Sequence, residues 1–211
     1  MNRLFYLCAR KTKKVRLVRQ KYEEYIMENK IVTIAIACTA FAMIACQDNR
    51  DCTYDAEKHS LACPEKTYAV LDIGDKVWMA ENLAVYSPDS STCYDNNHDN
   101  CVSTGRLYTW EAALSSVCPI GWRLPTRQDF KDAFGTADVE DLKKPDVFNV
   151  QFAGFKYYDG KFADKGASAS FWTAGAYDDS RAYLVRVTDS SVAYEHFNKN
   201  IFASVRCLKE K

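Results

Sequence analysis

The sequence of 211 residues contains few of the residues that build common catalytic and metal sites. Its three histidines, His59, His98 and His196, are scattered, and no Cys-x-x-Cys motif occurs. Structural zinc sites need four Cys or His ligands in short paired spacings, so no such site is expected. No Ser/His/Asp set is recognisable, and any general base would have to be a carboxylate. We therefore expect neither enzyme activity nor a metal or cofactor.

A basic surplus and long apolar runs are also missing. Residues 1–45 hold 9 of the 28 basic and 3 of the 28 acidic residues, so residues 46–211 hold 19 basic and 25 acidic residues, a formal net charge of −6. This acidic excess argues against nucleic acid as a partner, because phosphate binding needs a basic surface. The apolar stretch Ile31–Ala45 has 15 residues. It is shorter than the roughly 20 residues of a membrane-spanning helix but suits a signal peptide.

The residues around this stretch are typical of a bacterial lipoprotein signal peptide. Met27-Glu-Asn-Lys30 forms an ordinary start, so we interpret residues 27–45 as the signal peptide and residues 1–26 as a basic extension upstream of the true start. A cytoplasmic extension that delays export is the alternative. Ile44-Ala45-Cys46 predicts acylation of Cys46, against plain secretion or an uncleaved anchor, and acyl chains would attach the protein to a membrane. The acidic Asp48 and Asp51 resemble surface-export signals of some Gram-negative groups, which favours the outer-membrane surface.

Six cysteines remain once Cys46 and the two cysteines of the targeting region are set aside. An even number in an exported domain indicates disulfides, although six thiols allow 15 pairings. One pair flanks a polar segment that can fold back as a hairpin, a second encloses turn-forming residues, and the last two cysteines then remain for each other. The predicted disulfides are Cys52–Cys63, Cys93–Cys101 and Cys118–Cys207. The last would close a loop of about 90 residues and stabilise the fold by roughly 4 to 5 kcal/mol in the chain-entropy model.

The chain after Cys46 is predicted to consist of a tether and one domain. Residues 46–66 are polar and show no helix or strand pattern beyond the hairpin, so we expect a tether there. Thr67–Ile73 and Lys76–Ala80 are β-prone and flank a Gly74-Asp75 turn. The folded domain is therefore expected to span residues 67–211.

Two helices are predicted in the first half of this domain. The apolar residues of Thr109–Cys118 recur at the spacing of one helix face, and Pro119 ends the helix. Thr126 begins a second helix, with Asp129 as its capping-box partner and Gly135 as its stop. Helices followed by strands indicate an α+β fold. The predicted strands of the second half are Val150–Tyr158, Ser170–Ala176, Arg181–Thr188, Ser191–Asn198 and Ile201–Leu208.

Several motifs of the domain occur in a characteristic order. They are Tyr68-Ala-Val-Leu-Asp-Ile-Gly-Asp-Lys-Val-Trp-Met-Ala-Glu-Asn-Leu83, Gly105-Arg-Leu-Tyr-Thr-Trp110, Cys118-Pro-Ile-Gly-Trp-Arg-Leu-Pro-Thr126, Ala153-Gly154, Asp159-Gly-Lys-Phe162, Phe171-Trp172 and Ser204-Val-Arg-Cys207. In order and spacing they resemble the Fibrobacter succinogenes major paralogous domain, over about residues 67–210. The resemblance implies an exported, often lipid-anchored domain of cell-surface type.

A more distant resemblance is to C-type lectin-like and formylglycine-generating-enzyme-like folds. In those folds a cystine joins the first helix to the last strand, which agrees with the predicted Cys118–Cys207 pair. The implied fold is α+β and C-type lectin-like, with two helices packed on short antiparallel sheets and stapled by disulfides. The calcium-binding tripeptides of sugar-binding lectins are absent, since the nearest, Lys144-Pro-Asp146, puts a cation where an oxygen ligand is required. The copper-binding thiols of the enzymes are not expected either, because the cysteines are assigned to disulfides.

One short segment imitates a calcium-binding loop. Asp95-x-Asn97-x-Asp99 matches the opening of an EF-hand loop, but the twelfth position is Arg106 instead of glutamate. We interpret the segment as a turn pinned by the predicted Cys93–Cys101 disulfide, with a calcium site as the alternative.

The aromatic residues supply the candidate binding site. The four tryptophans are expected in the core, because they lie at motif positions within amphipathic elements. The tyrosines of the strand-and-turn half could instead form an apolar platform on which sugar rings stack, although core packing would explain any alternating half of them. The tyrosines of this candidate platform are Tyr157, Tyr158, Tyr177, Tyr183 and Tyr194.

These observations lead to a function hypothesis and two rivals. The leading hypothesis is a non-catalytic exported lipoprotein that displays a lectin-like domain for adhesion or recognition, with polysaccharide as the candidate ligand. The first rival is a structural or assembly protein of the cell envelope that binds protein partners through the same face. The second is a hydrolase, which would need a pocket with converging carboxylates.

Overall fold

The computed structural model describes residues 50–115 and 117–211, which belong to one unit, Asn49–Lys211. This part of the chain is α+β, with most of its regular structure in sheets and only short helices. The basic extension at 1–26, the signal peptide at 27–45 and Cys46 lie outside the described residues. Within the described ranges, no helix is long and apolar enough to cross a membrane.

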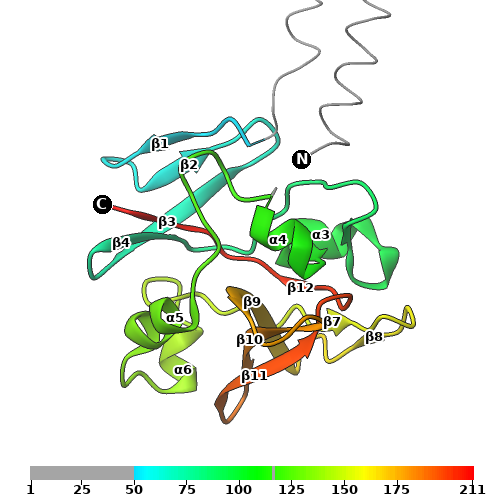
Figure 1. Ribbon diagram of the computed structural model, residues 1–211. Coiled ribbons are helices and arrows are strands. Elements are labelled where there is room, and N and C mark those ends of the chain that lie inside the picture. Colours follow the sequence, from blue (N-terminus) through cyan, green and yellow to red (C-terminus); the bar gives the residue numbers. More distant parts are fainter. Residues whose placement is uncertain (1–49, 116) are drawn as a thin grey trace, which may run out of the picture. The chain divides into compact units, whose positions relative to one another are not determined.

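One sheet combines the first strands of the unit with its last strand (Figure 1). Its order is β1-β2-β3-β4-β13, and every neighbouring pair is antiparallel. Gly74 has a φ of 63° and allows the tight turn between β3 and β4, because glycine adopts this backbone conformation at no steric cost. The strands are β1 Thr53–Asp55, β2 Ser60–Ala62, β3 Thr67–Ile73, β4 Lys76–Met79 and β13 Leu208–Glu210.

The expected tether is wrong for residues 50–66, because β1 and β2 lie inside it. β2 pairs with β3, and the Cys52–Cys63 disulfide closes the β1–β2 hairpin. Leu61 of β2 is fully buried. Each of the two strands has three residues, too few to show an alternating pattern in the sequence. The folded unit therefore begins close to Arg50.

A six-stranded sheet holds the strands of the second half, in the order β11-β10-β9-β12-β6-β5. Its pairs are antiparallel except for β9 and β12, which are parallel, so the expectation of purely antiparallel sheets is wrong at this position. A separate pair, β7 and β8, is antiparallel. The bounds are β5 Ser91–Thr92, β6 Leu107–Tyr108, β7 Phe155–Lys156, β8 Phe162–Ala163, β9 Ser168–Ala176, β10 Arg181–Thr188, β11 Val192–Asn198 and β12 Ala203–Ser204.

The described residues form four short α-helices, two more than predicted. α5 begins as expected, because Thr126 Oγ1 accepts a hydrogen bond from the Asp129 backbone N–H (3.1 Å) and the Asp129 carboxylate accepts one from the Thr126 N–H (2.7 Å). Gly135 ends it with a φ of 52°. The helices are α3 His98–Thr104, α4 Trp110–Ser115, α5 Arg127–Phe134 and α6 Val139–Leu142, and a 3-10 turn, η1, spans Tyr94–Asn96.

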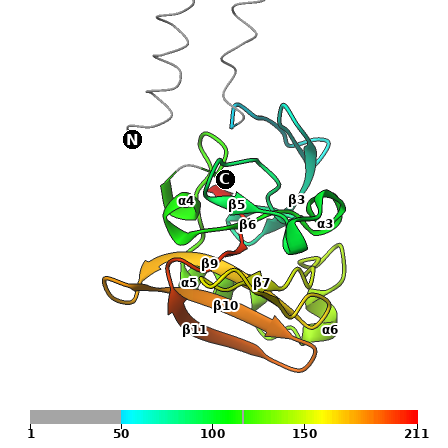
Figure 2. The ribbon, with the colours of Figure 1, turned by 90° about the vertical axis from the view of Figure 1, so that its right-hand side faces the viewer.

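Two hydrophobic cores lie on opposite faces of β9, β10 and β11. Along β10, Val185 and Val187 belong to the core that contains Phe130 of α5, whereas Leu184 belongs to the core that contains Trp172 of β9. Successive strand residues point to opposite faces, so one hairpin contributes to both cores. Figure 2 shows α4 together with β5 and β6, the far strands of the same sheet, on one side of β9, β10 and β11.

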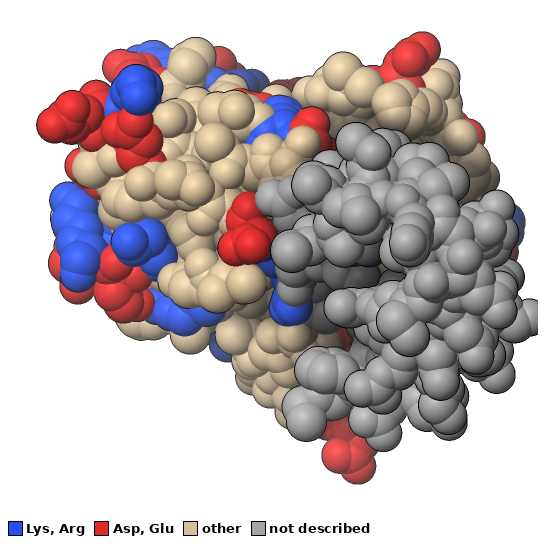
Figure 3. Space-filling view, turned by 90° about the horizontal axis from the view of Figure 1, so that it is seen from above, with Lys and Arg blue, Asp and Glu red and all other residues tan. Residues whose placement is uncertain are grey.

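Charged side chains are mixed on the surface. On the face shown in Figure 3, basic and acidic residues lie next to each other and do not form separate areas of one sign. Ion pairs agree with this pattern, for example Lys58 with Asp55 (2.6 Å) and Arg123 with Glu210 (2.6 Å). Such exposed pairs contribute little to stability, typically about 0 to 1 kcal/mol each.

Candidate functional site

The motif residue Arg206 lies in the core, between β12 and β13. Its side chain is fully buried, and its Nε donates a hydrogen bond to Asn82 Oδ1 (3.0 Å). Its Nη atoms donate to the backbone carbonyls of Phe148 and Asn149. The guanidinium also lies 4.8 Å from the ring centroid of Phe148 and 5.5 Å from that of Phe171. Burial lowers the pKa of Arg206, and the side chain joins three segments of the fold.

Asn82 and Gly105 complete the same junction. Asn82 Nδ2 donates to the carbonyl of Thr104 (2.9 Å), while its Oδ1 accepts from Arg206. Gly105 has a φ of 77°, and a Cβ at this position would lie 2.7 Å from Asn82 Cβ and 2.9 Å from the Leu83 carbonyl oxygen. These motif residues are therefore explained by packing and backbone geometry, without a ligand.

Three of the four tryptophans are core residues, as expected. Trp110 Nε1 donates to the carbonyl of Thr173 (2.8 Å), and Trp172 Nε1 donates to that of Tyr108 (2.8 Å). Trp78 is 1% exposed and packs edge-on against Phe130 in the core beneath α5. Trp122 is half-buried, so it differs from the other three.

Asp129 of α5 is linked to β13 through Arg123, which lies in the loop before α5 and forms ion pairs with both Asp129 and Glu210. Its Oδ2 lies 2.7 Å from Arg123 Nη1, and Arg123 Nη2 lies 2.6 Å from Glu210 Oε1. Burial would raise the pKa of Asp129, but hydrogen bonds from Arg123 and Thr126 outweigh it and lower the pKa to about 2. A carboxylate with so low a pKa is a poor general base at neutral pH, so Asp129 has a structural role.

The structure contains the three disulfides that the sequence predicts. Their Cα–Cα distances are 4.2 Å for Cys52–Cys63, 5.0 Å for Cys93–Cys101 and 5.7 Å for Cys118–Cys207. The last joins the loop after α4 to the residue before β13, and Cys207 is fully buried. It thus connects the helical half to the end of the chain.

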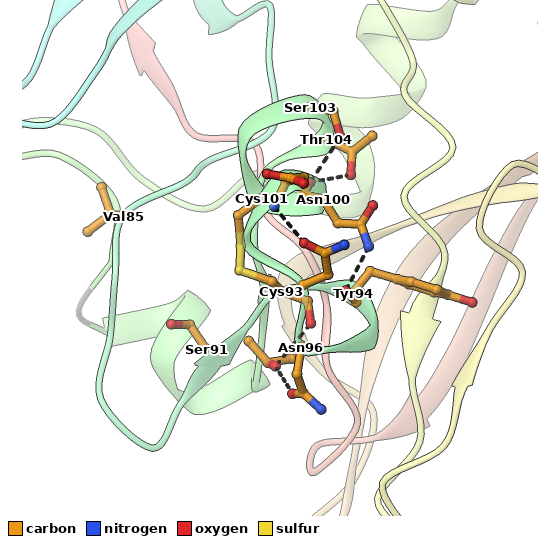
Figure 4. The surroundings of a disulfide bond; sticks show 12 residues. Val85, Ser91, Cys93, Tyr94, Asn96, Asn100, Cys101, Ser103 and Thr104 are labelled. Carbon is orange, nitrogen blue, oxygen red and sulfur yellow. Dashed lines mark hydrogen bonds between the residues drawn. A yellow bond between two sulfur atoms is a disulfide. The ribbon is translucent and has the colours of Figure 1, made fainter.

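The segment that imitates a calcium loop is folded as η1 and α3 within the second disulfide (Figure 4). Asn97 accepts a hydrogen bond from the Asp99 backbone N–H (3.0 Å) and caps α3. Asn100 Nδ2 donates to the Tyr94 carbonyl (2.8 Å). The side chains thus satisfy the local backbone. No group of three or more His, Cys, Asp or Glu in the described chain could hold a metal ion.

The structure separates the five candidate tyrosines into two groups. The Tyr157 ring packs against Phe155 (4.7 Å), which lies in the same core as Leu184. Tyr183 points to the opposite face, because it is adjacent to Leu184 on β10. Tyr158 follows Tyr157 in the turn before β8 and is 74% exposed. One platform of five rings therefore does not form.

Tyr177, Tyr183 and Tyr194 gather with His196 in what we call the tyrosine strip. Tyr183 and His196 are directly opposite in the β10–β11 register, and Tyr194 is two residues before His196. The Tyr177 ring stacks on His196 at 3.9 Å and meets Tyr183 edge-on at 5.4 Å. Tyr177 is 45% exposed and the other three are half-buried. The strip thus lies at the surface beside the core that contains Phe130 of α5.

Two cations of α5 cover the rings of the strip. The Arg127 guanidinium carbon lies 4.4 Å from the Tyr183 ring centroid and 5.8 Å from that of Tyr194. Lys131, one helical turn later, places its Nζ 5.5 Å from the Tyr194 centroid. Burial raises the pKa of the Tyr194 hydroxyl, so it stays protonated at neutral pH. The rings therefore face solvent through a layer of positive charge.

Neither Arg127 nor Lys131 has a carboxylate within 4.0 Å among the residues that the structure describes. Two buried nitrogen atoms beside the rings, Arg127 Nε and His196 Nδ1, also lack a hydrogen-bond partner. Buried polar atoms are usually paired, and an unpaired one calls for an explanation. The two cations over the rings are therefore the groups to which a ligand with negative charge would be attracted.

The carboxylate nearest in sequence to Tyr177 is already engaged. Asp178 accepts hydrogen bonds from Arg181 Nε (2.8 Å) and from the backbone N–H of Ser180 (2.9 Å), and these bonds hold the turn between β9 and β10. These contacts, that of Arg181 first, lower the pKa of Asp178. Arg181 also lies 4.7 Å from the Tyr177 ring centroid. This arrangement can bind a ligand, but it offers no pair of converging acids.

Sequence reasoning found the three tyrosines of the strip and missed Arg127, Lys131 and His196. The two cations belong to a helix that the sequence does predict, at positions four residues apart. That spacing placed them on one helix face, but nothing in it showed which strand the face would cover. Cys46, the predicted lipidation site, lies outside the described residues.

Comparison with protein families matches part of the domain. Residues 71–137 match the family described as the Fibrobacter succinogenes major domain. The resemblance stated from the motifs is confirmed for this segment. No curated protein and no solved structure matches the chain, so the C-type lectin-like fold stays a prediction.

Proposed function

We propose that the protein is an exported, lipid-anchored surface protein whose major domain recognises acidic polysaccharide and catalyses no reaction. The observation that supports this most is the tyrosine strip beneath the unpaired Arg127 and Lys131. The disulfide from the helical half to the end of the chain supports a lectin-like architecture. The apolar stretch that ends at Cys46 supports export and acylation.

The chemistry of the strip favours sugars that carry carboxylates. Aromatic rings bind the apolar faces and edges of sugar rings, while an arginine fork binds a carboxylate through two parallel hydrogen bonds. Both kinds of group lie together here, because Arg127 lies over the rings of Tyr183 and Tyr194 and has no acidic partner in the described chain. Since residues 46–211 carry a net charge of −6, attraction to an acidic polymer would be local to this patch and sensitive to salt.

Affinity electrophoresis and calorimetry with polygalacturonate test this proposal. The methyl-esterified polymer is the matched ligand control, because it keeps the sugar rings and loses the charge. Arg127→Ala should weaken binding by about 10- to 100-fold, the effect of one charge-assisted hydrogen-bonded contact. Arg106→Ala is the matched variant control, because Arg106 also lies over a tyrosine ring, at 5.0 Å from that of Tyr86. Equal affinity for both polymers, or for Arg127→Ala and wild type, would refute the proposal.

The role of the rings is tested by a second pair of variants. Tyr177→Ala should weaken binding to polygalacturonate, because Tyr177 packs against His196 and Tyr183 and is the most exposed ring of the strip. Tyr158→Ala removes a more exposed ring outside the strip and should leave binding unchanged. An equal loss in both variants would mean that rings elsewhere on the surface carry the interaction.

A second candidate function is assembly with a protein of the cell envelope. β11 is an edge strand of the six-stranded sheet, with seven residues, Val192–Asn198. Edge strands offer backbone donors and acceptors to a strand of another chain. Crosslinking in intact cells separates the two functions: one stoichiometric protein partner crosslinked at β11, with no polygalacturonate binding, would favour assembly.

A further inference from the structure

The loop between α4 and α5 exposes apolar side chains beside a shallow pocket. Ile120 is 63% exposed, and Leu114 at the end of α4 is 44% exposed. Both line a pocket of about 310 Å³, together with Trp122 and Cys118. Neither side chain belongs to one of the two cores. Because two large aliphatic residues are exposed side by side around one pocket, the surface resembles an interaction site more than scattered exposure.

The same loop contacts the beginning of the folded unit. The Ile120 backbone N–H donates to the carbonyl of Arg50 (3.0 Å). The Trp122 ring packs edge-on against Tyr54 of β1, with 6.1 Å between ring centroids. Arg50 also lines the pocket. The loop is therefore held against the first residues of the unit, and the Cys52–Cys63 disulfide fixes the hairpin that follows them.

Only a short stretch of chain separates this loop from the predicted lipidation site. Cys46 and Arg50 are four residues apart in the sequence. Extended chain spans at most about 3.6 Å per residue, so the two Cα atoms can be at most about 14 Å apart in any conformation. If Cys46 is acylated, the polar interface of the membrane is within reach of Ile120.

We propose that the surface formed by Leu114, Ile120 and Trp122 lies against the phospholipid bilayer that holds the acyl chains of Cys46. This inference rests on the proposed lipid anchor and goes beyond it, because it assigns an orientation to the domain. Tryptophan and aliphatic side chains are suited to the membrane interface, where an apolar body and a polar edge are both satisfied. The short stretch of chain between Cys46 and Arg50 would keep this surface at a high effective concentration beside the bilayer. A few apolar side chains would then be enough to hold the surface against the lipid.

This orientation would direct the tyrosine strip away from the lipid. In Figures 1 and 2, β1 and β2 lie at one end of the described unit and β10 and β11 at the other. The loop is held at the first end by Arg50 and Tyr54, and the strip lies on the strands of the second end. Membrane contact and polysaccharide binding would therefore use opposite ends of the domain.

Tryptophan fluorescence tests the membrane contact. The full-length protein, purified from membranes, is placed in vesicles of phosphatidylethanolamine and phosphatidylglycerol, with or without brominated acyl chains that quench nearby indoles. Trp78, Trp110 and Trp172 are at most 5% exposed, so the quenching reports on Trp122. We expect brominated vesicles to reduce the emission of the wild type. Ile120→Ser should lower the ratio of lipid-facing to free orientations about tenfold, because the variant no longer transfers a large aliphatic side chain from water to lipid. The quenching of Trp122 should fall accordingly.

Tyr158→Ser is the matched control, because it removes a 74% exposed side chain from the turn between β7 and β8 and should leave the quenching unchanged. Mass spectrometry of the vesicle-bound protein is performed first. Protein without acyl chains on Cys46 would refute the anchor, and with it the orientation. Acylated protein that shows no quenching, or equal quenching in Ile120→Ser, would refute the orientation alone. Crosslinks from Ile120 to an envelope protein, without quenching, would also refute it.

Discussion

The disulfide between Cys118 and Cys207 should contribute more to stability than the one between Cys93 and Cys101. The first pair is 89 residues apart in the sequence and the second 8. In the chain-entropy model, a closed loop of about 90 residues stabilises by about 4.6 kcal/mol and one of about 9 residues by about 2.6 kcal/mol. Cys93, Cys101 and Cys207 are buried and Cys118 is half-buried, so removing the sulfur atoms of the longer loop should not cost more than removing those of the shorter one. The difference of about 2 kcal/mol should therefore come from the loop lengths.

Equilibrium unfolding in urea measures this difference. The double variant Cys118→Ala/Cys207→Ala should lose about 2 kcal/mol more of the free energy of unfolding than Cys93→Ala/Cys101→Ala, at a similar dependence on urea. Mass mapping must show the remaining two disulfides intact in each variant. Equal losses, or a larger loss for the short loop, would show that the long-range link is not the main covalent constraint on the fold.

Two further predictions concern motif residues. Hydrogen bonds lower the pKa of Asp129 to about 2. The stability that the Asp129 carboxylate contributes is therefore complete above its unfolded pKa near 3.9 and is lost as the pH falls towards 2. Unfolding measured along an acid titration should show a loss of about 2 kcal/mol in the wild type, and Asp129→Asn should lack this loss. Gly105→Ala should lower the melting temperature more than Gly160→Ala, because both have positive φ but only a Cβ at Gly105 would meet backbone atoms, 2.8 and 2.9 Å away. Equal melting temperatures would contradict the packing explanation.

The sequence predicted elements whose pattern is complete within a short window. β3 has the bounds that its β-prone residues predicted, β10 begins and ends where expected, and α5 has its cap, its capping box and its glycine stop. Each of these segments carries its own signal, either a run of β-prone residues or a named end residue. Local patterns of this kind survive in the structure because packing does not oppose them.

Elements that depend on distant partners were missed. β1, β2, β5 and β6 have two or three residues each, and they are strands only because a neighbour pairs with them. The predicted strand Ile201–Leu208 divides between two sheets because Arg206 turns inward to the Asn82 side chain and the carbonyls of Phe148 and Asn149. No pattern in residues 201–208 reveals those three partners.

The candidate site shows the same limit. The five tyrosines could be named from the sequence, but their division into two faces follows from strand parity and from the Phe155 contact. Arg127 and Lys131 became part of the site only once α5 packed across β10 and β11. Conversely, motif residues such as Arg206 and Gly105 hold the fold through buried contacts.

The central claim is that the motif residues build the scaffold while the tyrosine strip binds the ligand. Nuclear magnetic resonance of the labelled protein during titration with a short oligogalacturonate tests it most directly. The account predicts saturable chemical-shift changes centred on Arg127, Tyr183, Tyr194 and His196, with little change at Arg206 or Trp122. Changes centred on the Trp122 loop or the Arg206 junction, or no saturable change at all, would contradict it.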